Sequence, residues 1–92
     1  MTDINKLYRI ENNLRRAGVL SWVYAFCVKH NISFFNLLDT DDRTLTTLRH
    51  EVWCVVHDTL GLSYPKTGQL FEVDHTSILH AWRAKQEKLV AA

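Results

Sequence analysis

The stretch LSYPKTGQLFEVDHTSILHAWR, residues 62–83, decides how this chain is expected to fold. Ser63 stands where a helix N-cap belongs, because its hydroxyl can accept a hydrogen bond from a backbone N–H one turn later. Pro65 falls near the first turn, where a missing N–H does least harm. The pattern predicts a short helix that ends around Phe71.

A second helix is predicted directly after the connector Glu72-Val73. Asp74 can cap it, and it runs from His75 to about Leu89. Its apolar positions fall at helical spacing: Ile78, Leu79, Ala81, Trp82 and Leu89. Two short helices separated by so brief a turn have the spacing of a helix-turn-helix.

Upstream of this pair, an acidic loop at residues 39–42 leads into a helix that begins at about Thr44 or Thr46. Apolar residues recur along it at steps of three and four, at Leu48, Val52, Val55, Val56 and Leu60. Gly61 is its expected C-terminal stop, because glycine readily adopts the left-handed conformation that ends a helix.

The N-terminal part predicts three further helices. The first covers residues 2–16, with Asp3 in its first turn and Gly18 at its end. The second is more thoroughly buried and stops near Asn31; its apolar residues are Val19, Trp22, Val23, Ala25, Phe26 and Val28. Ser33 is the expected N-cap of a short apolar helix that follows it.

Glycine and proline are scarce and alternating strand patterns are absent, so we predict an all-α fold, a compact domain of five to six helices. A chain of 92 residues forms one domain, residues 1–92, with an extra N-terminal helix at about 2–17. We expect no transmembrane segment and no secretory signal, and hence a cytoplasmic protein with reduced cysteines. A net charge of +1 means that any binding to nucleic acid depends on local patches.

Residues 62–83 resemble the C-terminal DNA-binding domain of the DnaA replication-initiator family, whose signature reads approximately S-L-P-E-I-G-x-L-F-G-R-D-H-[ST]-T-[IV]-[LI]-H-A-x-R. The residues in register are Ser63, Pro65, Gly68, Phe71, Asp74, His75, Thr76, Leu79, His80, Ala81 and Arg83. The resemblance continues upstream through NLLDTDDRTLTTLRHEVWCVVHDTLGL and covers roughly residues 23–89.

This resemblance implies a set of DNA contacts. In the family, the start of the last helix reads bases in the major groove, and an arginine that begins the preceding long helix supports that contact. The implied base readers are Asp74, His75, Thr76 and Ser77, and the implied flanking contacts are Arg49 and His50. Further expected contacts are Arg43, Lys66 and Arg83, of which Arg83 would meet a backbone phosphate.

The chain departs from the family in three ways. Asp39, Asp41 and Asp42, with only Arg43, stand where the family has a strongly basic loop that reaches the minor groove. Glu72-Val73 replaces a Gly-Arg pair. These changes remove cations, so we expect weaker binding and a target other than the family's standard site. No phosphate-binding loop for a nucleotide is present, so the chain is no initiator itself.

Residues that could form a metal site, a stacking surface or a catalytic site are better explained by packing in the fold. The pairs Cys27/His30 and Cys54/His57 have the spacing of zinc ligands, but they lie within apolar helical patterns, and we expect no metal. Tryptophans 22, 53 and 82 fit core or partner packing better than stacking on single-stranded DNA. No nucleophile has a paired base, so we expect no enzyme and no cofactor.

The leading hypothesis is therefore a sequence-specific binder of double-stranded DNA that regulates transcription or replication in a bacterium, prophage or phage. The alternative is a protein-interaction adaptor that keeps the DnaA-like fold with weak or no DNA binding. Under either hypothesis the N-terminal helix could serve as the surface for a homodimer or for a regulatory protein partner. We expect no membrane and no nucleotide as partners.

Overall fold

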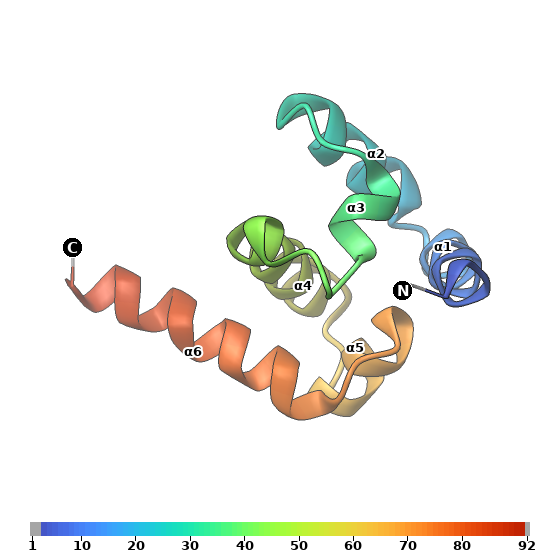
Figure 1. The fold of residues 1–92 in the computed structure, drawn as a ribbon. Helices are drawn as coiled ribbons and strands as arrows, with labels where there is room; N and C mark the ends of the chain where they lie inside the picture. Colours follow the sequence, from blue (N-terminus) through green and yellow to red (C-terminus); the bar gives the residue numbers. More distant parts are fainter. Residues whose placement is uncertain (1–2, 92) are drawn as a thin grey trace. The chain divides into compact units, whose positions relative to one another are not determined.

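The structure is a computed structural model that describes residues 3–91 and, within them, the side chains of residues 3–87. Its helices are α1 (Ile4–Ala17), α2 (Leu20–Lys29), α3 (Phe34–Leu38), α4 (Thr46–Leu60), α5 (Tyr64–Phe71) and α6 (His75–Ala91), with a short 3-10 helix, η1 (Arg43–Leu45), before α4 (Figure 1). The described residues contain no strand, which confirms the all-α prediction of five to six helices. Thr2, the predicted start of the first helix, lies outside the described residues.

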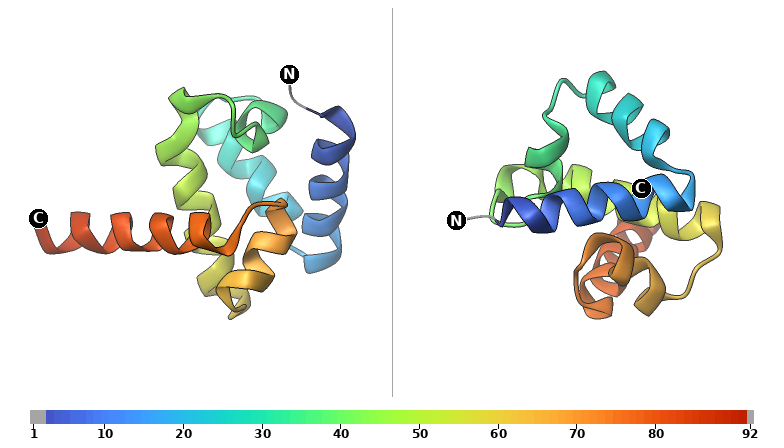
Figure 2. Two further views of the ribbon diagram at one scale, coloured as in Figure 1. Left: turned by 60° about the horizontal axis from the view of Figure 1, so that its bottom comes forward. Right: turned by 90° about the vertical axis from the view of Figure 1, so that its right-hand side faces the viewer.

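Contacts divide the chain into two compact units, residues 1–49 and residues 50–92, and α4 runs through the boundary. In the first unit, α1, α2 and α3 all contact one another and run in different directions around a small core (Figure 2). The core side chains of these three helices, with the residue before α2, are Leu7, Ile10, Leu14, Val19, Leu20, Val23, Phe26, Cys27, Leu37 and Leu38. The predicted single domain over residues 1–92 stays a prediction.

In the second unit α5 packs on α6, which continues as a long helix beyond α5 (Figure 2). The unit buries side chains of α4, α5 and α6: Val52, Trp53, Cys54, Val56, Thr67, Phe71, Ile78 and Ala81. The buried positions on α5 and α6 come at intervals of three or four residues, so each helix offers one face to the core.

Local chemistry sets the helix ends as the sequence predicts. The hydroxyls of Ser33 and Ser63 accept hydrogen bonds from the backbone N–H groups three residues later, and Gly18 ends α1 with φ +79°. Asp3 is the N-cap of α1 rather than a member of its first turn, and its carboxylate accepts a hydrogen bond from the N–H of Asn5 at 3.0 Å.

The prediction that the second helix is thoroughly buried is wrong for one face of α2. Val23 is fully buried, but Trp22, Ala25 and Val28 are exposed, and Val28 is 81% exposed. The reason is geometric: α2 meets its neighbours along one face only, so its other apolar side chains face outward.

Candidate DNA interface

The first helix of the candidate helix-turn-helix, α5, is fixed at its start by a buried threonine. The hydroxyl of Thr67 donates to the carbonyl of Ser63 at 3.0 Å, and Nδ1 of His57 lies 3.2 Å from the hydroxyl oxygen of Thr67. Because the Thr67 proton is already donated, the His57 ring is the donor in the second bond. The His57 ring also stacks on Tyr64 at 4.6 Å. The end of α4 and the start of α5 are therefore joined by polar and ring contacts that sequence reasoning missed.

The turn between α5 and α6 is tight enough to require a glycine. The N–H of Val73 donates to the carbonyl of Gly68 at 2.9 Å, and a Cβ added at Gly68 would lie 2.6 Å from the carbonyl oxygen of Val73. Glu72 holds the left-handed conformation at φ +51°, in the place where the DnaA signature has glycine. A non-glycine residue here carries backbone strain on the order of 1 kcal/mol.

The first turn of α6 is capped by Asp74, as the sequence predicts. Its carboxylate accepts hydrogen bonds from the backbone N–H of Thr76 at 2.9 Å and from the Thr76 hydroxyl at 3.0 Å. The backbone hydrogen bond from Thr76, and next its hydroxyl, lower the pKa of the Asp74 carboxyl below its usual range. Nδ1 of His75 lies 3.2 Å from the same carboxylate.

The predicted base readers do not share one environment. Asp74, His75 and Thr76 are exposed, whereas Ser77 is half-buried. Directly after them Ile78 is 1% exposed and anchors the helix in its core. The turn that would meet base edges thus stands on a buried support, which is the arrangement that a recognition helix needs.

Arg49 occupies a different position from the flanking DNA contact that the resemblance implies. Its side chain is only 4% exposed, and its guanidinium donates to the backbone carbonyls of Asn36, Leu37, Asp39 and Asp42. Burial, although opposed by Asp42 and Asp39, lowers the pKa of Arg49 from its ordinary value. In this structure Arg49 holds the chain between α3 and η1 and offers no surface to a phosphate.

The acidic loop at residues 39–42 uses its carboxylates in local turns. Asp39 accepts a hydrogen bond from the N–H of Asp41 at 3.0 Å, and Asp42 accepts one from the N–H of Thr44 at 3.1 Å. Arg43, the predicted contact in this region, is exposed. The loop therefore presents acidic side chains where the DnaA family has a basic loop.

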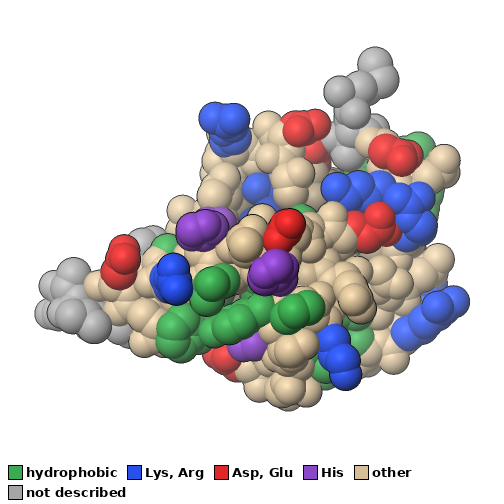
Figure 3. All heavy atoms as spheres, turned by 90° about the horizontal axis from the view of Figure 1, so that it is seen from below, with side chains coloured by type: hydrophobic (Ala, Val, Ile, Leu, Met, Phe, Trp, Pro, Cys, Tyr) green, Lys and Arg blue, Asp and Glu red, His purple; other side chains and the backbone are tan. Residues whose placement is uncertain are grey.

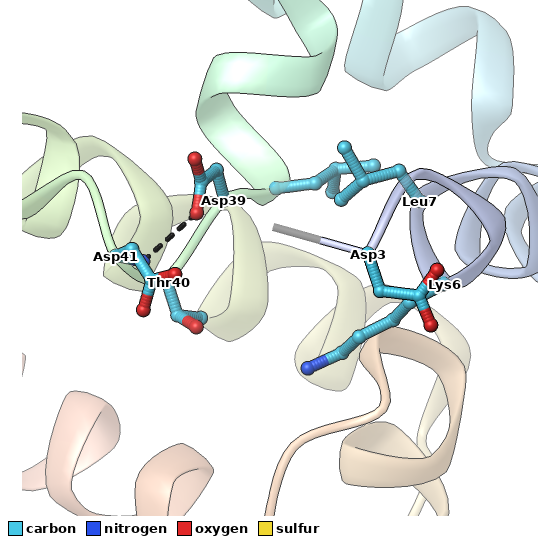
Figure 4. A pocket seen from close by; sticks show the side chains of 7 residues that line it. Asp3, Lys6, Leu7, Asp39, Thr40 and Asp41 are labelled. Atoms are coloured by element: carbon cyan, nitrogen blue, oxygen red, sulfur yellow. Dashed lines mark hydrogen bonds between the residues drawn. The ribbon is translucent and has the colours of Figure 1, made fainter. Parts of the chain in front are cut away.

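A pocket of about 200 Å³ lies between this loop and the start of α1 (Figure 4). Its lining residues are Asp3, Lys6, Leu7, Leu38, Asp39, Thr40 and Asp41. The lining has three aspartates and one lysine, so its net negative charge disfavours a phosphate or any other anion.

The remaining predicted contacts belong to the second unit. Lys66 and Arg83 are exposed on α5 and α6, and the half-buried ring of His50 lies 5.4 Å from that of Trp53. Along α6, hydrophobic side chains reach the surface beside histidines (Figure 3). Residues 50–92 contain four Lys or Arg against five Asp or Glu, a net charge of −1. Attraction to phosphate therefore rests on a few individual cations.

The cysteine and histidine pairs have packing partners. Cys27 and Cys54 are buried thiols whose pKa values are raised by that burial. The His30 ring contacts Phe26 at 4.3 Å, and the His57 ring stacks on Tyr64. Within residues 3–91 no group of three or more His, Cys, Asp or Glu side chains is placed to hold a metal ion.

No described helix has both the length and the apolar character needed to cross a membrane. None of the protein-family models, curated proteins or solved structures compared with the chain matches it.

Proposed function

We propose that the protein binds double-stranded DNA through the helix-turn-helix α5–α6 and regulates transcription or replication in a bacterium, prophage or phage. The observation that carries the proposal is the exposed first turn of α6. His75 and Thr76 are exposed there, while the next residue but one, Ile78, is buried. The likeness of residues 62–83 to the DnaA signature supports the same assignment.

Each exposed group at the start of α6 has a role in this proposal. Nε2 of His75 can donate to or accept from a base edge, because the contact with Asp74 uses Nδ1. The Thr76 hydroxyl is already donated to Asp74, which leaves its methyl group for the methyl of a thymine. Asp74 orients both residues.

Cations outside this turn supply backbone contacts. Arg83 and Lys66 are exposed and can each neutralise one phosphate, which sets the register of the helix without reading sequence. Arg43 is the third exposed cation among the predicted contacts, and the buried Arg49 adds none, so we count ~3 phosphate contacts in all. The protein then acts by occupying its site, either to recruit a partner or to exclude a competitor.

Selection from randomised duplex DNA at low salt tests this proposal. We expect enrichment of one short motif and its binding at least tenfold tighter than random duplex, because base contacts supply most of the discrimination. Uniform weak binding, or none at low salt, would contradict the proposal. The protein-interaction adaptor would then be the better hypothesis.

A further inference from the structure

The large hydrophobic side chains that are exposed in the described part of the chain all lie on α1 and α2. Ile4 and Tyr8 of α1 are 49% and 50% exposed, and Tyr24 and Val28 of α2 are 39% and 81% exposed. None belongs to the helix-turn-helix. The first unit thus carries apolar surface that its own core leaves uncovered.

Ring contacts through α3 join the two exposed tyrosines into one face. The ring centroids of Tyr8 and Phe35 lie 5.4 Å apart, those of Phe35 and Phe34 5.6 Å, and those of Phe34 and Tyr24 4.7 Å. One helical turn extends the row at each end, to Ile4 and to Val28. We call the six residues Ile4, Tyr8, Phe34, Phe35, Tyr24 and Val28 the aromatic face.

The aromatic face is large enough to bind. Its four exposed members present on the order of 400 Å², the size at which a patch on a small protein is often functional. Edge-to-face contacts between the rings hold Tyr8 and Tyr24 in place. Rigid tyrosines of this kind are common anchors in protein interfaces, because little conformational entropy is lost when they bind.

The helices that build this face are strongly basic. Residues 4–38 hold five Lys or Arg and a single acid, Glu11, a net charge of +4. Glu11 is bound internally, because it accepts a hydrogen bond from the Tyr24 hydroxyl at 2.7 Å and lies 3.5 Å from the Arg15 guanidinium. Arg15 and Arg16 lie about two turns beyond Tyr8, and Lys29 follows Val28. Positive charge therefore flanks the aromatic face beyond Tyr8 and beside Val28, whereas the Ile4 end adjoins Asp3 and the acidic loop.

These features select among possible occupants. A second copy would bring the same positive charge against this one in a symmetric dimer, which opposes association. A DNA backbone takes hydrogen bonds from polar donors and would leave the exposed Ile4, Tyr8 and Val28 uncovered. A protein segment with apolar side chains and flanking acidic residues can do both: its apolar side chains cover the rings, and its carboxylates pair with the cations.

We propose that the aromatic face of α1–α3 docks an acidic, amphipathic segment of a partner protein. The partner's apolar side chains cover the rings and Val28, and its carboxylates meet Arg15, Arg16 and Lys29. This docking uses no residue of α5 or α6, so it is a second function beside the proposed DNA binding. The partner segment can bind whether or not DNA is bound.

A synthetic helical peptide with Leu and Trp on one face and Glu on the other is a direct probe. In fluorescence anisotropy at 0.1 M salt, we expect it to bind at least tenfold tighter than a scrambled peptide of equal composition or a peptide with Lys in place of Glu. Val28→Glu, a change at an 81% exposed site, should weaken binding at least tenfold. Thr59→Glu makes the same change of charge at an exposed position of α4 and should leave binding unchanged.

Several results would overturn this proposal. Equal binding of the acidic and scrambled peptides would mean that charge alone attracts them, and full binding by Val28→Glu would remove the aromatic face from the contact. A dimer in sedimentation that Val28→Glu dissociates would assign the face to a second copy. If Val28→Glu abolished the binding of duplex DNA, the aromatic face would be assigned to DNA phosphates.

Discussion

Replacing Arg49 by methionine removes the group that holds the chain between α3 and η1. The guanidinium is 4% exposed, and its Nε donates to the carbonyl of Leu37 at 2.6 Å while a terminal nitrogen serves Asn36, Asp39 and Asp42. Methionine has similar length but no donor, so all four carbonyls lose the guanidinium, although those of Asn36 and Asp39 still accept a hydrogen bond from a backbone N–H. A hydrogen bond from a charged donor contributes ~1.5–3 kcal/mol, and a buried acceptor left without one costs a similar amount.

We therefore expect Arg49→Met to lower the free energy of unfolding by about 3 kcal/mol. This value allows for water, which can hydrogen-bond the carbonyls of the half-buried Asp39 and Asp42 once the guanidinium is gone. For a protein of this size that loss lowers Tm by roughly 12–24 °C. Urea unfolding followed by circular dichroism measures the change. Arg49→Lys should recover less than half of it, because a single ammonium cannot reproduce the planar fork of donors.

Arg43→Met is the matched control, because this arginine is exposed and lies six residues upstream. Its effect on the free energy of unfolding should stay below about 0.5 kcal/mol. A loss under about 1 kcal/mol for Arg49→Met would refute the structural role. If Arg49→Met stayed as stable as wild type but lost DNA binding, the contact implied by the family resemblance would be the correct one.

Three further predictions concern charge and metal. With ~3 phosphate contacts, the plot of log affinity for DNA against log salt should have a slope near about −3, and a slope steeper than about −6 would reveal a basic surface that the structure does not show. The folded state lowers the pKa of Asp74, so the stabilisation from its cap is fully present above the ordinary carboxyl pKa near 3.8 and is lost as pH falls below that value. The difference in unfolding free energy between wild type and Asp74→Ala should therefore be constant from pH 5 to 8 and should shrink in acid. A difference that is unchanged at pH 2 would contradict the cap. A chelator should leave Tm unchanged and elemental analysis should find no stoichiometric zinc, whereas bound zinc would reassign Cys27, His30, Cys54 and His57.

Sequence reasoning succeeded where structure depends on near neighbours. Ser63 and Asp74 cap helices through groups two or three residues away, so their roles can be predicted from local order. The all-α fold follows from apolar spacing in the same way.

It failed where distant parts of the chain meet. Arg49 takes carbonyl partners 7 to 13 residues upstream, and nothing in its immediate sequence distinguishes a buried arginine from an exposed one. Likewise Tyr8 and Tyr24 form the aromatic face only because α3 brings Phe34 and Phe35 between them. The available signal was that Tyr8 and Tyr24 fall outside the core positions of α1 and α2.

The central claim is that the first turn of α6 reads bases, and the most direct measurement compares His75→Ala and Thr76→Ala with His80→Ala. His80 is an exposed histidine of the same helix, five residues on and so on another face. A base contact is worth about 1 to 3 kcal/mol, so each of the first two changes should narrow the gap between the selected site and random duplex by roughly 5-fold to over 100-fold. His80→Ala should leave that gap unchanged. If all three proteins keep the melting temperature of wild type and bind the selected site as tightly as wild type does, α6 does not read DNA by its first turn.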